Sequence, residues 1–379
     1  MYKIRHIRSF EEFTNLSEPW KLLLAESPSN NYFLSWDWLW HWWNVYGKQD
    51  DSLTILLVED GEEIIGIAPF YVRKRFLCGI YPVRRMMFLG TQEEGGGDVG
   101  SDYMNIICRA GEERRVADAL FEAIAGKNIC DEIYLSKMDA STDSFTLFQK
   151  KAEKLGFFTM ITNEFISPYI QLPSTWDEYL NSLAPSMRYK IRKERRKFER
   201  CGTAVVRKVE NLEDFSGGFE ELIKLHKKRW EARGMEGAFS HPLFTEFHKR
   251  IMPEMLKRGQ LDLILLSENG ESKAILYNIF YNDKIYFYQS GIDTTNGKSS
   301  FGYLLHSRCI EDAITRGLKE YDFLPKGQSD DYKDRFSRQR RAVADVYMAR
   351  QWAVKNVARA EELARSIYHR FKPHLLKVK

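Results

Sequence analysis

One short pattern occurs twice in this chain and constrains the fold more than any other feature of the sequence. The segment Leu56–Glu62, LLVEDGE, aligns with Leu265–Glu271, LLSENGE. Each copy joins residues of high strand propensity to an Asp-Gly or Asn-Gly pair. Such pairs form the tight turns of β-hairpins because they accept positive φ angles. We expect the returning strands at Glu63–Val72 and Ser272–Tyr281.

The elements predicted after each hairpin also follow a similar order, which supports a duplicated unit. The first half continues with a Gly-rich stretch (Gly90–Gly100), a helix (Glu112–Ala125) and a strand (Glu132–Leu135). The second half continues with a strand (Lys284–Ser290), a loop (Gly291–Ser300), a helix (Gly302–Arg316) and a strand (Glu320–Phe323). Helical regions precede the hairpins at Glu11–Glu26, Ser35–Tyr46, Trp176–Cys201 and Asp214–Arg233. The sequence predicts an α/β (α+β) fold of two mixed-sheet halves with helices on both faces.

A length of 379 residues suits two domains of ordinary size. We place the halves at residues 1–165 and 166–350, with the junction near Thr162–Pro173. Residues 351–379 are predicted to form a C-terminal helix, because Trp352–Phe371 is rich in Ala and Arg.

The positive charge of the chain is concentrated in one segment. The formal net charge is +4, yet Met187–Arg200 alone holds eight Lys or Arg against two Glu and is net +6. Such a helix can be a solvated face, or it can bind a phosphorylated acceptor through residues such as Arg192, an anionic membrane surface, or RNA.

Several classes of protein are not expected from the sequence. The five cysteines are scattered, without a Cys-x-x-Cys pair, which argues against a zinc site, a redox motif or a disulfide framework. No apolar run approaches the roughly 20 residues that cross a bilayer, and Met1–Phe10 lacks the apolar core of a signal peptide. We therefore expect a cytoplasmic protein without a metal.

The segment from Tyr286 to Tyr303 has features of a coenzyme-binding loop. A strand ends near Gly291, small residues follow, and a helix begins at Phe301. The free amides at a helix start attract anions, and Lys298 adds a full charge. The cofactor-binding candidates are Gln289, Ser290, Gly297, Lys298, Ser299, Ser300, Phe301, Gly302 and Tyr303. The spacing is not that of a Walker A motif, and the alternative is an ordinary loop capped by Ser300.

The second half resembles the BioF2-like or CelD-type acetyltransferases, a branch of the GNAT (Gcn5-related N-acetyltransferase) superfamily, and more distantly the FemABX peptidyltransferases. The matching features are Leu225–Trp230 with Arg233-Gly234, the hairpin at Gly270, Gly291-Ile292-Asp293, Ser300-Phe301-Gly302, Gly317–Phe323 and Tyr332-Lys333. In the first half, Phe33–Leu39 with Trp42-Trp43 and Gly66–Phe70 are similar to the opening of the same family. The loop departs from the family, because many GNAT proteins have Arg/Gln-x-x-Gly-x-Gly/Ala at this place.

The resemblance implies a tandem GNAT-like acyltransferase that needs no metal. It would move an acyl group from acetyl-CoA or a longer acyl-CoA to an amine or hydroxyl of a sugar, polysaccharide or cell-envelope precursor. One rival is a Fem-like peptidyltransferase that uses aminoacyl-tRNA. The long coiled-coil arm of Fem proteins has no counterpart here, so a nucleic-acid partner is not expected. The other rival is a non-catalytic module that binds a membrane or polymer through its basic helix.

Four residues are candidates for catalysis. Asp322, at the end of a predicted strand, is the first candidate for the base, although an Asp at this place also caps turns. His226 has a suitable intrinsic pKa but lies in a basic helical stretch where it can simply pack on Trp230. Lys333 can stabilise an oxyanion or remain solvated, and Tyr288 can protonate a leaving thiolate or belong to the core.

The acceptor site is predicted between the halves. Trp36, Trp40 and Trp43 share one helical face and are expected in the core, so Trp38 and Trp42 remain to line a groove or to pack as well. Arg229, Trp230 and Arg192 are further acceptor-binding candidates in the second half. The acidic residues around Gly95–Gly97 would repel a pyrophosphate, so we expect the first half to shape the acceptor site.

Overall fold

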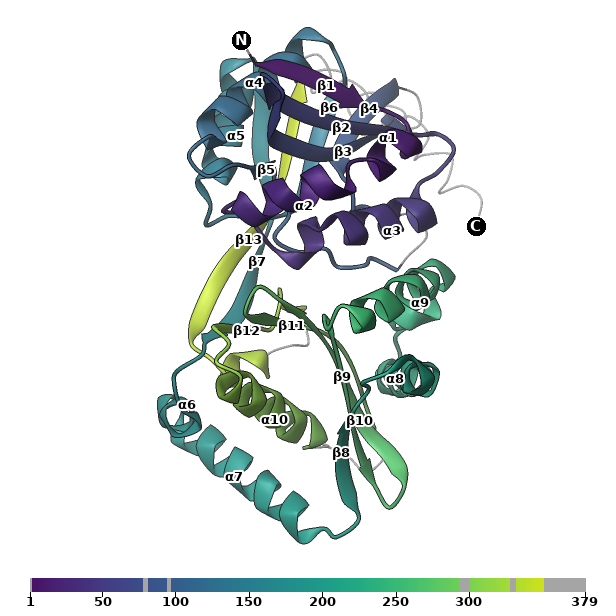
Figure 1. Ribbon diagram of the computed structural model, residues 1–379, viewed down its shortest axis with the longest axis vertical. Helices are drawn as coiled ribbons and strands as arrows, with labels where there is room; N and C mark the ends of the chain where they lie inside the picture. Colours follow the sequence, from purple (N-terminus) through teal and green to yellow (C-terminus); the bar gives the residue numbers. More distant parts are fainter. Residues whose placement is uncertain (1, 78–80, 94–96, 294–299, 328–331, 351–379) are drawn as a thin grey trace, which may run out of the picture.

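The computed structural model describes residues 2–77, 81–93, 97–293, 300–327 and 332–350, and its strands form one continuous mixed sheet (Figure 1). The first half contains β1 (Lys3–Ile7), α1 (Phe10–Thr14), α2 (Ser17–Glu26), η1 (Tyr32–Leu34), α3 (Trp36–Tyr46), β2 (Asp51–Asp60), β3 (Glu63–Leu77), β4 (Tyr81–Phe88), β5 (Ile107–Cys108), α4 (Glu113–Gly126), β6 (Glu132–Asp139), α5 (Asp143–Lys154) and β7 (Phe157–Gln171). The second half contains α6 (Trp176–Ser182), α7 (Pro185–Arg200), β8 (Ala204–Lys208), α8 (Leu212–Glu231), η2 (Ala238–Ser240), α9 (Pro242–Lys257), β9 (Leu261–Glu268), β10 (Glu271–Tyr281), β11 (Lys284–Ile292), α10 (Phe301–Thr315), β12 (Glu320–Asp322), η3 (Lys333–Arg335) and β13 (Gln339–Arg350).

The repeat seen in the sequence is a repeat of structure. The pairs β2–β3 and β9–β10 are antiparallel hairpins, and their turns use positive φ at Gly61, Asn269 and Gly270. After each hairpin, two parallel strands flank one helix: β4 and β6 around α4, and β11 and β12 around α10. The predicted fold class is therefore confirmed.

The two halves are joined by the long strands β7 and β13. These strands pair antiparallel from Gln339↔Tyr169 to Arg350↔Phe157. β13 also pairs with β6, whereas the end of β7 pairs with β12, so the sheet order is β1-β2-β3-β4-β6-β13-β7-β12-β11-β10-β9-β8, with β5 beside β3. The last described strand of the chain thus lies within the sheet of the first half. The boundary predicted at residues 165 and 166 falls inside β7.

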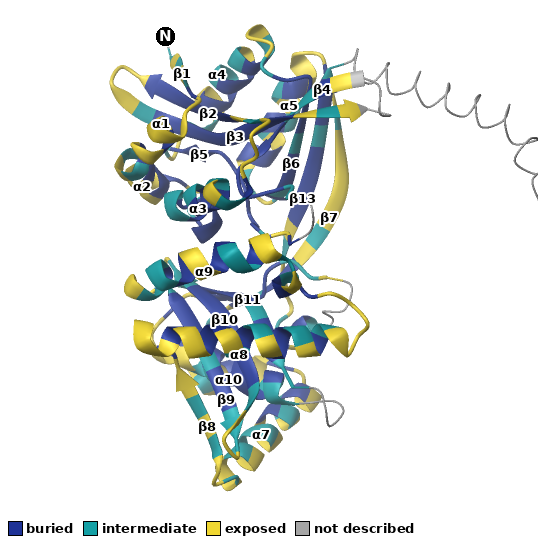
Figure 2. Cartoon of the chain, turned by 90° about the vertical axis from the view of Figure 1, so that its right-hand side faces the viewer, coloured by how far each residue is buried: buried dark blue, intermediate teal, exposed yellow. Residues whose placement is uncertain are grey.

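The hydrophobic core is shared between the halves. One buried cluster runs from the first half across α3 and α9 into the face of β9–β11, and the other lies under α6, α7 and α10. The ring of Trp38 in α3 is 4.7 Å from Phe247 in α9 and 5.8 Å from Tyr288 in β11, measured between centroids. Figure 2 shows α3 facing α9 across this boundary.

The tryptophan-rich helix is oriented differently from our expectation. Trp38 and Trp42 are fully buried, whereas Trp36, Trp40 and Trp43, the expected core face, are only half-buried. The reason is that one face of α3 packs against α9 and the sheet. The opposite face is covered only in part, by α1, where Trp36 contacts Phe13.

Two predicted helical regions are interrupted. Glu11–Glu26 is divided into α1 and α2, and Trp176–Cys201 into α6 and α7, where Pro185 occupies a helix start because it has no N–H to donate. The expected helix Trp352–Phe371 lies outside the described residues. In the part of the chain that the structure describes, no helix is both long and apolar enough to traverse a lipid bilayer.

Candidate active site between the halves

A cavity of about 320 Å³ lies where β11 and β12 separate. The two strands pair only from Lys284↔Glu320 to Tyr286↔Asp322, after which β11 continues to Ile292 paired with β10 but not with β12. Tyr288 is the extra residue of a β-bulge opposite Tyr277 and Asn278 in β10, and bulges of this kind redirect side chains next to active sites. We call this space the junction cavity, and it is lined by Asp98, Gly100, Asp102, Lys137, Phe165, Arg229, Trp230, Phe287, Tyr288, Gln289, Ser290, Leu324, Pro325, Lys326, Gly327, Tyr332 and Lys333.

Six residues that the sequence singled out meet in this cavity. They are Tyr288, Gln289, Ser290, Arg229, Trp230 and Lys333. The Arg229 guanidinium donates a 2.6 Å hydrogen bond to the Ser290 hydroxyl, so α8 is tied to β11 at the cavity wall. The predicted cofactor and acceptor candidates of α8 and β11 therefore share one site.

Lys333 is a buried cation at this site. Its side chain is only 6% exposed, and its ammonium donates to the Phe323 carbonyl at 2.8 Å and lies 5.6 Å from the Phe287 ring centroid. A charge held in a low-dielectric wall interacts strongly with negative charge that develops nearby. Lys333 is therefore well placed to stabilise an oxyanion.

Asp102 faces the cavity from the first half, and the sequence did not indicate it. It is 6% exposed, and within the described part of the chain no group donates a hydrogen bond to its carboxylate. Burial raises the pKa of Asp102 to about 7; Asp98 and Asp322 add to the rise, while Lys137 and Lys333 oppose it. Such a group exchanges protons near neutral pH, as a general base must. The only signal in the sequence is the nearby acidic stretch around Gly95–Gly97, from which the sequence predicts only repulsion of a pyrophosphate.

The Tyr288 hydroxyl is engaged on the other side of the strand. It donates to the Val99 carbonyl of the first half and lies 3.0 Å from Nε2 of His248. Burial raises the pKa of Tyr288 well above its usual value. To protonate a leaving group, as predicted, the hydroxyl would have to give up its contact with Val99.

His226 lies beside the cavity and does not line it. Trp230 donates from Nε1 to Nε2 of His226 at 3.0 Å, and the imidazole packs against Gly237. Burial, assisted by the Arg229 charge, lowers the pKa of His226 to about 4, so the ring is neutral at physiological pH. This geometry matches the packing alternative that the sequence left open.

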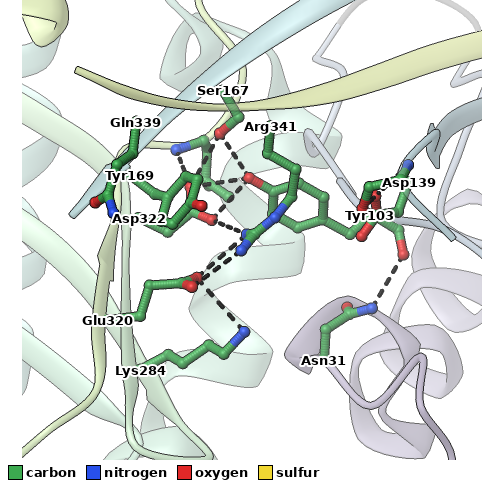
Figure 3. Close-up of polar contacts among 12 residues, drawn as sticks. Asn31, Tyr103, Asp139, Ser167, Tyr169, Lys284, Glu320, Asp322, Gln339 and Arg341 are labelled. Carbon is green, nitrogen blue, oxygen red and sulfur yellow. Dashed lines mark hydrogen bonds and ion pairs between the residues drawn. The ribbon is translucent and has the colours of Figure 1, made fainter. Parts of the chain in front are cut away.

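Asp322, the first candidate for the base, is enclosed in a network that joins the halves (Figure 3). Its carboxylate accepts hydrogen bonds from the Tyr103 hydroxyl (2.8 Å), the Ser167 hydroxyl (3.0 Å), the Arg341 guanidinium (2.8 Å) and the Leu324 amide (2.7 Å). Arg341 also bonds both carboxylate oxygens of Glu320, at 3.2 and 2.9 Å. Burial raises the pKa of Asp322 while Arg341 lowers it. Asp322 does not line the cavity.

The predicted coenzyme loop is only partly described. Gly297, Lys298 and Ser299 lie outside the described residues. The Ser300 hydroxyl donates to the Glu194 carboxylate of α7 at 2.5 Å, and the space beside them holds about 20 Å³. A carboxylate thus stands near the described start of α10, where a pyrophosphate was expected.

The remaining candidates at this loop and in α3 pack within the fold. Gly302 lies against Ile292, Phe301 lines the small space beside Glu194, and Tyr303 stacks on Phe336 with ring centroids 5.5 Å apart. The indole N–H of Trp38 donates to Ser101 (2.8 Å), and that of Trp42 donates to Glu93 (2.6 Å). Neither tryptophan lines the junction cavity.

Arg192 is exposed on α7, away from the junction cavity. Five cations of this helix (Arg192, Lys193, Arg196, Lys197 and Arg200) have no carboxylate within ion-pairing distance among the described residues. Across the ranges that the structure covers, no cluster of three His, Cys, Asp or Glu residues has the geometry of a metal site.

Comparison with known proteins supports the mixed α/β, GNAT-like fold described above. Residues 185–334 match the family described as "Acetyltransferase (GNAT) domain". No curated protein matches the chain. FemX is similar in structure (TM-score 0.59, 14% identity, 91% of this chain and 96% of that chain). So is the C-terminal domain of a putative lysylphosphatidylglycerol synthetase from Agrobacterium fabrum (TM-score 0.52, 9% identity, 95% and 97%). At these identities the likeness shows a shared GNAT-like fold.

Proposed function

We propose that this protein is an acyltransferase whose reaction takes place in the junction cavity. The observation that supports it is the convergence of Asp102 from the first half and Lys333 from the second half on one space at the separation of β11 and β12. Asp102 replaces Asp322 as the proposed base, because the carboxylate of Asp322 already accepts four hydrogen bonds.

The proposed step is acyl transfer to an amine or hydroxyl. The acceptor attacks the carbonyl carbon of the activated acyl group while Asp102 takes the proton of the attacking atom. The oxyanion of the tetrahedral intermediate is stabilised by the Lys333 ammonium. The new C–N or C–O bond forms, the bond to the leaving group breaks, and the proton passes to the leaving group. Gln289 and Ser290 line the space in which the acyl group must lie.

The proposed donor is an acyl-CoA, such as acetyl-CoA or a longer acyl-CoA, because the GNAT domain match covers the second half. The proposed acceptor is a sugar, polysaccharide or cell-envelope precursor. This choice of acceptor rests on the family resemblance of the sequence.

An aminoacyl-tRNA donor is the second candidate. Two observations favour it: the Glu194 carboxylate near the start of α10 would repel a pyrophosphate, and α7 presents five cations without carboxylate partners in the described residues. The structural neighbours FemX and lysylphosphatidylglycerol synthetase are compatible with this alternative.

Transfer assays with the purified protein test the proposal. Acyl-CoAs and aminoacyl-tRNA are offered in parallel to amine and hydroxyl acceptors, and the salt dependence of binding separates the donors because tRNA binding weakens steeply with salt. With the active donor, Asp102→Asn is expected to lower kcat by about 10²–10⁴-fold, and Lys333→Met by about 10²–10³-fold. Asp60→Asn and Lys249→Met, on exposed surface away from the cavity and from α7, are the matched controls. Unchanged kcat in Asp102→Asn contradicts the proposal.

A further inference from the structure

A second cavity, of about 790 Å³, lies on the other side of η3 from the junction cavity. It is enclosed by α6, the start of α7, and the segment from η3 to the start of β13. Lys333 of η3 lines the junction cavity, whereas Asp334 and Arg335 line this second space. We call it the α7 cavity. Figure 1 shows α6 and α7 beside α10 on the outer side of the second half.

The α7 cavity carries an excess of positive charge. Lys190, Arg335 and Arg338 line it, and in the described chain none of them has a carboxylate within ion-pairing distance. Of the two acidic residues in the lining, Asp334 is already paired with Lys326 (2.6 Å) and Arg340 (2.8 Å). The other, Glu178, accepts the amide of Ser174 at 3.2 Å. Of the three cations, at most one is balanced by the charge of Glu178, so an anion in the cavity would be attracted by at least two cations.

Two of these cations are held in place by an aromatic side chain. The Lys190 ammonium is 3.4 Å from the Tyr303 ring centroid, and Arg335 donates to the Tyr303 hydroxyl at 3.3 Å. Tyr303 is itself fixed by stacking on Phe336 at 5.5 Å. Cations fixed in this way lose less side-chain entropy when a ligand binds.

The start of α7, a helix of 16 residues without a capping side chain on Ala184, adds the amide of Ser186, because Pro185 has no N–H and the amides of Met187 and Arg188 bond the Ala184 carbonyl. Backbone N–H groups at a helix start and nearby Lys and Arg side chains together favour phosphate oxygens. Leu183 and Met187 supply apolar surface in the same lining. The lining thus suits a phosphate ester attached to an apolar or aromatic group.

We propose that the α7 cavity binds the phosphate or diphosphate of one of the two substrates while the acyl group reacts on the other side of η3. This inference rests on the proposed acyl transfer. The shared chemistry is a phosphate ester, which is present in the donor CoA and in a nucleoside-diphosphate sugar as acceptor. Lys333 and Asp334 are consecutive residues of η3, and Lys333 lines the junction cavity while Asp334 lines the α7 cavity, so both spaces adjoin the same short helix.

Calorimetric titration of the full chain tests this site with inorganic pyrophosphate, CoA and a nucleoside-diphosphate sugar. The double variant Lys190→Ala/Arg338→Ala is compared with Arg192→Ala/Lys193→Ala, which removes the same charge from the exposed part of the same helix. The first pair is expected to raise the Kd of pyrophosphate at least tenfold and the second less than twofold. Equal effects of the two pairs, or no pyrophosphate binding by the wild type, overturn the inference.

The other arms of the titration identify the source of the phosphate. Tighter binding of CoA than of pyrophosphate assigns the cavity to the donor, and tighter binding of the nucleoside-diphosphate sugar assigns it to the acceptor. If neither binds more tightly than pyrophosphate, the assignment to a substrate is wrong. Asp102→Asn must bind pyrophosphate as the wild type does, because binding needs no base. Loss of transfer with intact binding therefore tests the proposed function alone.

Discussion

The elevated pKa of Asp102 makes a quantitative prediction about stability. The pKa of the carboxyl rises from 3.8 to about 7 because the group is buried. Between pH 4 and 7 the folded state therefore holds a proton that the unfolded state has released. The free energy of unfolding falls as the pH rises through this window, by about 1.4 kcal/mol per pH unit. Over about three pH units the ionisation of Asp102 therefore lowers the free energy of unfolding by about 4 kcal/mol, and this loss is complete above pH 7.

Asp102→Asn removes this cost, since the amide stays neutral. We expect the variant and the wild type to be equally stable at pH 4, and the variant to be more stable at pH 8 by up to about 4 kcal/mol. Urea unfolding of both proteins from pH 4 to pH 8 measures the difference. Asp60→Asn, at an exposed carboxylate that does not line the cavity, is the control and should change stability by less than about 0.5 kcal/mol. A loss of stability at pH 8 in Asp102→Asn would mean that Lys137 or Lys333 stabilises an ionised carboxylate, and would refute the argument.

Two further substitutions test the packing around the site. Arg341→Met should destabilise the protein by about 3–5 kcal/mol in urea unfolding, because it leaves Asp322 buried without its cation and Glu320 with Lys284 alone. Arg340→Met, which breaks a more exposed pair, should cost less than about 1 kcal/mol, and equal losses would contradict this account. Gly237→Ala places a Cβ 2.6 Å from Cε1 of His226 and should lower the unfolding free energy by about 1–3 kcal/mol. Gly202→Ala meets no atom within 4 Å and should be close to neutral, so a similar loss there would argue against crowding as the cause.

Local signals in the sequence predicted much of the fold. The Asp60-Gly61 and Asn269-Gly270 turns fix both hairpins, and the amphipathic segments before β6 and β12 became α4 and α10 within one residue of the expected bounds. These features depend on neighbours in the chain, which a sequence displays directly. The insertion of β13 into the sheet of the first half is different. It depends on pairing with β6, about 200 residues earlier in the sequence, and no local pattern encodes this pairing.

The catalytic candidates show the same limit. Gln289 was singled out because strand, loop and helix follow one another along the chain, and Arg229 because its segment resembles a known family; both line the junction cavity. Asp102 was missed and Asp322 was preferred because the environment of each carboxylate depends on the opposite half: Asp102 lines a cavity together with Lys333, and Tyr103 donates a hydrogen bond to Asp322. An acidic residue in a loop does not reveal whether it will be buried without a partner. That is decided only when the halves meet.

Asp322 acts on the proposed base through Tyr103, the residue after Asp102. Tyr103 has a φ of 58°, a left-handed conformation that costs a non-glycine residue roughly 1–2 kcal/mol. It is held at both ends: its carbonyl accepts from Asn31 at 3.0 Å, and its hydroxyl donates to Asp322 at 2.8 Å. These contacts fix the backbone that points Asp102 into the cavity. Asp322 is therefore a positioning residue in this scheme.

Tyr103→Phe tests that role, since it removes the hydroxyl and keeps the ring against Arg341. We expect kcat to fall by about tenfold to a hundredfold, because a small displacement of a catalytic group has effects of this size. The pH–rate profile should keep its midpoint near the Asp102 pKa of about 7, since the base itself remains. Tyr169→Phe, on the other face of Arg341, is the matched control and should leave kcat unchanged. If Tyr103→Phe retains the wild-type kcat, the Asp322 network holds the halves together without orienting the base.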